Sequence, residues 1–209
     1  MGSGNKIRGT GRSKAKTPVL DRLNPDETVE VLRRLLAAHP DLVGEAERTA
    51  TAVLGAVTFE DVANDVEDAV RAPDLDDLHG RAGRHEWGYV EPTEAVWEIL
   101  DEAVQAFVDD IKRRIELGLE TEALEICKGV LLGLYRVEHG KSEGLLEYAS
   151  DFPAEAAGGA IEAWRTGDRG KKPARAGARR KRPVFPQEFI DRFVPEWRDM
   201  IGRVLSRKR

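Results

Sequence analysis

The chain has 209 residues, of which 41% are apolar and 34% are charged. Its length suffices for one sizeable core or two small ones, and its apolar fraction is too high for a wholly disordered chain. No run approaches the roughly 18 consecutive apolar residues of a membrane span, and the N-terminus lacks an apolar signal core. The single cysteine excludes an intramolecular disulfide and a multi-cysteine zinc site. We therefore expect a soluble, cytoplasmic protein.

The net charge of −5 combines three unlike blocks. Residues 1–18 have a charge of +5, residues 19–165 a charge of −19, and residues 166–209 a charge of +9. Each block presents its own electrostatic field. Composition then predicts four parts: a disordered basic arm (1–18), an acidic helical bundle (19–165), a flexible basic linker (166–184) and a C-terminal amphipathic helix (185–209).

Helix start signals and apolar residues at helical spacing recur along the acidic block and again near the C-terminus. Asn24 and Thr58 are typical N-caps, Pro92 suits a first turn, and Gly118 suits a C-terminal stop. Pro195 predicts a kink or a break in the last helix. The predicted helices cover about residues 25–38, 42–54, 59–70, 74–78, 92–117, 120–137, a short helix capped by Ser142, 151–164 and 187–207.

No segment alternates convincingly between apolar and polar residues, so we expect an all-α fold. Short connections favour antiparallel neighbours, which predicts a helical-hairpin bundle or a short helical stack. The helix over 120–137 is apolar nearly all round and is expected to be surrounded by others. Within it, Gly129 and Gly133 share a face that would let a neighbouring helix approach closely, and Cys127 is expected to be buried.

The clearest chemical feature is a cluster of seven cations within twelve residues: Lys171, Lys172, Arg175, Arg179, Arg180, Lys181 and Arg182. Such a run can contact successive phosphates of DNA or RNA without reading sequence. The alternatives are contact with an acidic partner or with the chain's own acidic block, and a neutral, solubilising linker.

Residues 80–91 are predicted to form the longest ordered loop. Its Arg84, His85, Trp87 and Tyr89 are residue types that anchor protein interfaces. We expect Arg84 and nearby Arg81 to pair with carboxylates, and the two aromatic residues to pack onto the core. A metal or acid–base site around His79 and His85 is the alternative, but their spacing matches no metalloprotease pattern. We predict no catalytic residue, metal or cofactor.

The last helix has an apolar face that includes Phe189, Phe193 and Trp197. This face can pack on the chain's own bundle or in the groove of a partner protein. The sequence leaves both alternatives open.

One stretch resembles a known family. Gly88-Tyr89-Val90, Leu100-Asp101-Glu102, Glu116-Leu117-Gly118-Leu119, Ala123-Leu124-Glu125-Ile126 and Gly133-Leu134-Tyr135 are similar to the helical region that accompanies SWIM-type zinc fingers in bacterial proteins. The similarity covers about residues 86–137. The zinc-finger ligands are absent, so no metal role carries over. The resemblance implies a helical-hairpin module for protein–protein interaction.

These observations favour a non-enzymatic helical adaptor that binds another protein through its bundle surface and C-terminal helix. A nucleic-acid-associated protein that uses its basic arms is the second hypothesis, and an enzyme or metal protein built around His79 and His85 is the third. Neither the partner's identity nor the oligomeric state follows from the sequence.

Overall fold

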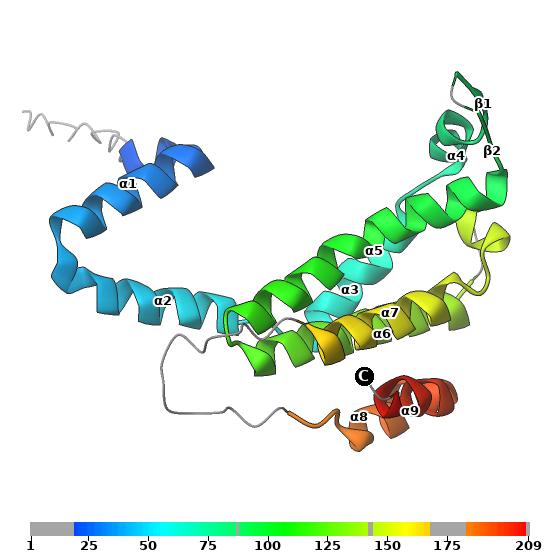
Figure 1. The fold of residues 1–209 in the computed structure, drawn as a ribbon. Helices are drawn as coiled ribbons and strands as arrows, with labels where there is room; N and C mark the ends of the chain where they lie inside the picture. Colours follow the sequence, from blue (N-terminus) through cyan, green and yellow to red (C-terminus); the bar gives the residue numbers. More distant parts are fainter. Residues whose placement is uncertain (1–18, 87, 142–143, 168–182, 208–209) are drawn as a thin grey trace, which may run out of the picture. The chain divides into compact units, whose positions relative to one another are not determined.

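The computed structural model describes residues 19–86, 88–141, 144–167 and 183–207, and these residues form an all-α fold (Figure 1). The α-helices are α1 (Pro25–Ala38), α2 (Val43–Gly55), α3 (Phe59–Arg71), α4 (Leu75–Arg81), α5 (Pro92–Glu116), α6 (Glu120–His139), α7 (Phe152–Thr166), α8 (Gln187–Phe193) and α9 (Arg198–Ser206). Short 3-10 helices cover Val19–Arg22, Pro40–Leu42, Gly144–Tyr148 and Pro195–Trp197. Within the described ranges, β structure is confined to one hairpin, β1 (Gly83–His85) and β2 (Gly88–Val90).

The predicted helix boundaries are confirmed where local chemistry sets them. Asn24 forms a capping box with Glu27, whose backbone N–H donates to Asn24 Oδ1 over 2.9 Å. The Thr58 hydroxyl accepts the backbone N–H of Asp61. After α5 the chain turns at Gly118, whose φ of +75° is a conformation that side-chain-bearing residues rarely adopt. Asp151 directly precedes α7, and its side chain makes no capping hydrogen bond.

The chain divides into two compact units, residues 1–52 and 53–209. This division differs from the single bundle that we expected over residues 19–165. In the described part of the first unit, no residue of α1 is buried, and the same holds for the whole of α2. The described residues of the first unit therefore form amphipathic helices without a buried core.

The core of the second unit lies among α3, α5, α6 and α7, which pack along one another (Figure 1). Helix α6 is central, as its apolar sequence predicts, and it buries Cys127 completely. Its two glycines allow the predicted close approach to α3. A Cβ atom on Gly129 would lie 2.5 Å from Val62 Cβ, and one on Gly133 would lie 2.7 Å from the Ala63 carbonyl oxygen.

The C-terminal segment packs on the same bundle. Phe185 and Phe189 are buried in its core, and the Phe189 ring meets the Phe59 ring of α3 edge-on, with 5.4 Å between centroids. Trp197 donates from Nε1 to Glu138 Oε2 of α6 over 2.8 Å. The predicted last helix is interrupted at Pro195, where a 3-10 turn separates α8 from α9. The apolar face of the C-terminal segment therefore packs on the chain's own bundle, which is one of the two alternatives that the sequence left open.

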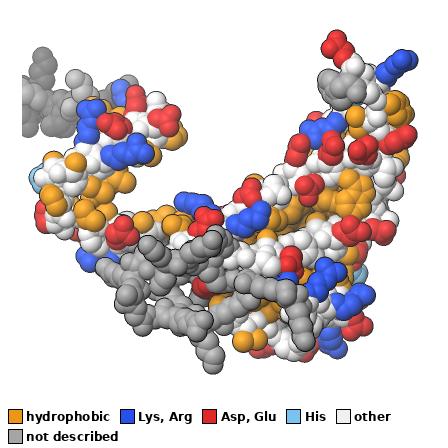
Figure 2. Space-filling model, in the orientation of Figure 1, with side chains coloured by type: hydrophobic (Ala, Val, Ile, Leu, Met, Phe, Trp, Pro, Cys, Tyr) orange, Lys and Arg blue, Asp and Glu red, His pale blue; other side chains and the backbone are white. Residues whose placement is uncertain are grey.

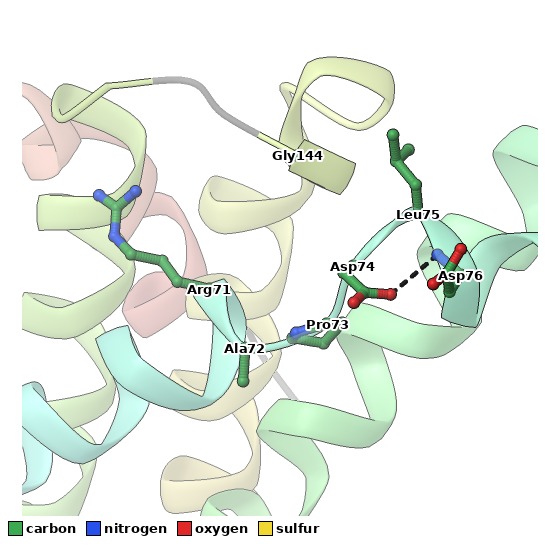
Figure 3. Close-up of a pocket in the computed structure, with 7 residues that line it drawn as sticks. All are labelled: Arg71, Ala72, Pro73, Asp74, Leu75, Asp76 and Gly144. Atoms are coloured by element: carbon green, nitrogen blue, oxygen red, sulfur yellow. Dashed lines mark hydrogen bonds between the residues drawn. The ribbon is translucent and has the colours of Figure 1, made fainter.

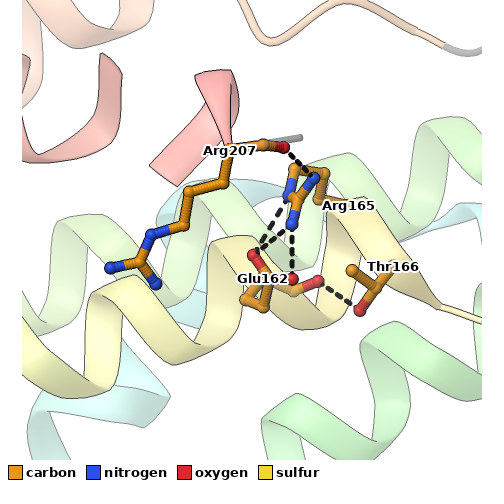
Figure 4. A network of polar contacts seen from close by, with 4 residues as sticks. All are labelled: Glu162, Arg165, Thr166 and Arg207. Atoms are coloured by element: carbon orange, nitrogen blue, oxygen red, sulfur yellow. Dashed lines mark hydrogen bonds and ion pairs between the residues drawn. The ribbon is translucent and has the colours of Figure 1, made fainter. Parts of the chain in front are cut away.

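Polar contacts also join the end of the chain to α7 (Figure 4). The Arg165 guanidinium donates to the Arg207 carbonyl oxygen over 2.7 Å and pairs with Glu162 one turn earlier on α7. Because Arg207 directly follows α9, this contact holds the end of the last helix against the bundle.

The surface of the second unit matches its acidic sequence. Figure 2 shows acidic side chains along the α5 side of the molecule, and Glu94, Glu98, Asp101 and Glu102 on this helix are exposed. In the described part of the chain, no helix has the length and apolar character needed to cross a membrane.

Candidate interaction site at the β-hairpin

Residues that we predicted to form a loop instead form the β-hairpin between α4 and α5. Its strands are antiparallel, with Gly83 opposite Val90, Arg84 opposite Tyr89 and His85 opposite Gly88. Directly opposed residues in such a pair project from the same face of the ladder. The register therefore places the cationic Arg84 next to the aromatic Tyr89, although the two residues are five positions apart in the sequence.

Two glycines make this short hairpin feasible. Gly83 and Gly88 have φ angles of +105° and +151°, in a range that favours glycine strongly over other residues. Each strand has only three residues. A strand of this length is too short to be recognised in the sequence from alternating apolar and polar residues. The sequence feature that could have indicated a turn here is the pair Gly83 and Gly88, which enclose four residues.

Helix α4 fixes one end of the hairpin to the bundle. Asp74 caps this helix, and its carboxylate accepts the backbone N–H groups of Asp76 and Asp77 over 2.8 and 3.1 Å. At the other end of α4, Arg81 donates two hydrogen bonds to the Glu102 carboxylate of α5, over 2.8 and 2.9 Å. The predicted carboxylate partner of Arg81 is thus confirmed.

This bidentate pair has electrostatic consequences for both groups. The hydrogen bonds from Arg81 lower the pKa of the Glu102 carboxyl, and those to Glu102 raise the pKa of the Arg81 guanidinium. The pair therefore favours the charged form of each side chain. It ties α4 to the middle of the long helix α5, directly before the hairpin begins.

His85 is the residue of β1 next to the turn, and its ring reaches back to the end of α4. Its Nε2 lies 2.7 Å from the Arg81 carbonyl oxygen, and because a carbonyl oxygen only accepts, Nε2 carries the proton in this contact. The ring is partly buried, whereas His79 is exposed on α4. Among the residues described, no group of three or more His, Cys, Asp or Glu side chains is arranged to hold a metal ion.

The two opposed residues of the ladder face solvent. Tyr89 is 61% exposed, so the expectation that it packs onto the core is wrong. Arg84 is also exposed, and no carboxylate of the described residues forms the predicted ion pair with it. Together with His85, Glu86 and Gly88 they line an open cavity of about 580 Å³. Trp87, which follows Glu86 in the sequence, lies outside the described residues.

A second cavity, of about 460 Å³, lies between the end of α3 and the start of α4 (Figure 3). Two of its polar side chains, those of Asp74 and Arg71, are already engaged in holding the fold. Asp74 caps α4, and Arg71 pairs with Glu67 and donates to the Lys141 carbonyl oxygen. Groups that are committed in this way offer little to a ligand, so we do not assign a site there.

The remaining predicted site residues fall into two groups. Phe189 and Trp197 are only 5% exposed and are covered by the chain itself, while Phe193 is partly exposed. All seven residues of the predicted basic cluster, from Lys171 to Arg182, lie outside the described residues.

No protein-family model, curated protein or solved structure gives a significant match to this chain. The resemblance to the helical region of SWIM-type zinc-finger proteins therefore stays a prediction.

Proposed function

We propose that this chain is a non-enzymatic helical adaptor that binds another protein through the β-hairpin surface formed by Arg84, His85 and Tyr89. The observation that carries the proposal is the exposure of Tyr89 directly opposite Arg84 in the ladder. Tyrosine and arginine dominate the binding energy of protein interfaces, because each combines a large contact area with a polar group.

The way in which the hairpin is mounted supports this proposal. A two-stranded hairpin alone is marginally stable in water. Here the Arg81–Glu102 pair and the His85 contact attach its base to α4 and α5, and Val90 and Ala82 pack against the core. A surface that is held in place before binding loses less conformational entropy on binding. The C-terminal helix is not part of the proposal, because its apolar face is used within the chain.

The experiment is affinity capture from the native host with the full chain and two variants. Tyr89→Ala and Arg84→Ala are expected to lose a protein that the wild type retains specifically. Leu117→Ala is the matched control, since Leu117 is 54% exposed and follows α5 at the end opposite to the hairpin. Equal capture by all four proteins would contradict the proposal.

A second candidate function is sequence-independent binding of nucleic acid by the basic cluster. The contact between the Trp164 and Phe185 rings favours it, because both ends of the intervening basic stretch are thereby attached to one bundle. Seven cations lie within twelve residues of the sequence between these two rings, and such a density of positive charge favours phosphate contacts. Binding of a DNA duplex or a single-stranded RNA should weaken steeply with salt and disappear when all seven residues are replaced by Gln. No binding at low salt would contradict it.

A further inference from the structure

Helix α1 has an apolar face that no described residue of its own unit buries. Val29, Leu32 and Leu35 are 45–48% exposed, and no described residue of the helix is buried. A helix of 14 residues is marginally stable in water unless an amphipathic face packs against something. The capping box at Asn24 stabilises one end of the helix but covers none of this face. The observation points to a partner for α1.

The charges beside this face indicate what the partner is. Glu27 is engaged in the capping box, and Glu30 pairs with Arg34 over 2.7 Å on the outer side of the helix. Asp26 and Arg33 remain, and neither makes an ion pair or a side-chain hydrogen bond with the part of the chain that the structure describes. They are seven residues apart, so they lie on the same edge of the apolar face, Asp26 in the first turn of α1 and Arg33 just past its middle.

We propose that α1 pairs with α1 of a second copy of this chain, with the two helices antiparallel. In that arrangement the apolar faces cover each other, and Asp26 of each copy lies near Arg33 of the other. A two-fold axis then makes two attractive pairs from one unpaired acid and one unpaired base. In a parallel pair an edge of one helix faces the opposite edge of the other, so neither Asp26 nor Arg33 would meet the complementary charge. Helix α2, which also buries no residue, can extend the contact.

This self-pairing is independent of the proposed function, because it uses the first unit and leaves the hairpin free. An unrelated partner would have to supply the complementary charges, whereas a second copy already carries them at the correct spacing. Taken together with the proposed function, such a dimer carries two hairpin surfaces. Two linked surfaces bind a multivalent partner more tightly than one surface does.

The first experiment measures the mass of the full chain in solution by sedimentation equilibrium over a range of concentrations. We expect a concentration-dependent dimer. Leu32→Glu places a charge at the centre of the apolar face and should give a monomer. Arg34→Ala, on the outer side of the helix, is the matched control and should remain a dimer. A wild-type chain that stays monomeric at all concentrations overturns the proposal.

The second experiment tests the charge pattern and does not depend on how a variant affects the helix alone. Asp26→Arg and Arg33→Asp each turn both pairs into repulsions, so each variant alone should raise the dimer Kd at least about tenfold, equivalent to about 1.4 kcal/mol. Mixed in equal amounts, the two variants restore both attractive pairs and should form a heterodimer. A mixture that stays as weakly associated as its components overturns the antiparallel arrangement. Failure here leaves capture through Tyr89 unaffected, so the two proposals fail separately.

Discussion

The rings of Trp164 and Phe185 meet edge-on, with 5.5 Å between their centroids and 80° between their planes. Trp164 lies near the end of α7 and Phe185 lies two residues before α8, so the contact joins the two sides of the basic stretch that separates these helices in the sequence. Both side chains are buried in the core of the second unit. The C-terminal helices are thus part of that unit, and the apolar face that could have served a partner stabilises the chain itself.

This relationship predicts a large effect of Phe185→Ala on stability. Removing a buried phenyl ring leaves a cavity and should lower the free energy of unfolding by about 3–5 kcal/mol. The neighbouring Val184 is 84% exposed, so Val184→Ala should change stability by less than about 0.5 kcal/mol. Urea unfolding followed by tryptophan fluorescence measures both. Similar, small effects of the two variants would mean that this segment does not pack on the bundle in solution.

The contact between α6 and α3 predicts that Gly129→Ala destabilises the protein, although alanine is the better helix former. Its Cβ would lie 2.5 Å from Val62 Cβ and 2.9 Å from the Phe59 carbonyl oxygen, so the helices must separate. We expect a net loss of about 1–3 kcal/mol, as in other overpacked cores.

Gly159→Ala is the matched control for this prediction. Gly159 lies inside α7, and a Cβ there would meet no atom within 4 Å. Alanine should therefore stabilise this helix by about 0.5–1 kcal/mol. Thermal unfolding of both variants gives opposite shifts in Tm if the glycines of α6 serve close packing, and shifts of the same sign if they do not.

The Arg81–Glu102 pair predicts a pH-dependent contribution to stability. Because Arg81 lowers the pKa of Glu102 in the folded state, the pair stabilises the fold above the carboxyl pKa of the unfolded chain, and this contribution is lost as the pH falls through the folded pKa. Glu102→Gln should therefore lower Tm at pH 7. It should have no effect on Tm at an acid pH that lies below the pKa of Glu102 in both the folded and the unfolded chain. Asp101→Asn, at an exposed neighbour, is the control. A difference that persists unchanged at acid pH would show that the charge on Glu102 is not responsible.

Burial raises the pKa of the Cys127 thiol, whose Sγ lies 3.8 Å from the Ala160 carbonyl oxygen. Because the thiolate is the reactive form, we expect no reaction of the native chain with a thiol reagent at pH 8 and one equivalent after denaturation. A Leu117→Cys variant places a second thiol at an exposed position and should react with one equivalent while folded. Rapid modification of Cys127 in the native wild type would contradict its burial in the core.

The sequence by itself determined the features that depend on neighbouring residues. The caps at Asn24 and Thr58, the turn at Gly118 and the break at Pro195 follow from side chains and backbone conformations within a few positions. The apolar helix around Cys127 was also predictable as a buried one, because a helix without a polar face needs other helices around it.

Tertiary structure decided what each apolar face meets. The stripes of α1 and α3 have the same helical spacing, yet Val66 of α3 is fully buried and Leu32 of α1 is 48% exposed. Residue types identified Arg84 and Tyr89 as candidates, but only the strand register placed them opposite each other, and only the fold covered Trp197. The physical reason is that periodicity records which side of an element avoids water, whereas the surface that covers this side comes from residues far away in the chain, or from another chain.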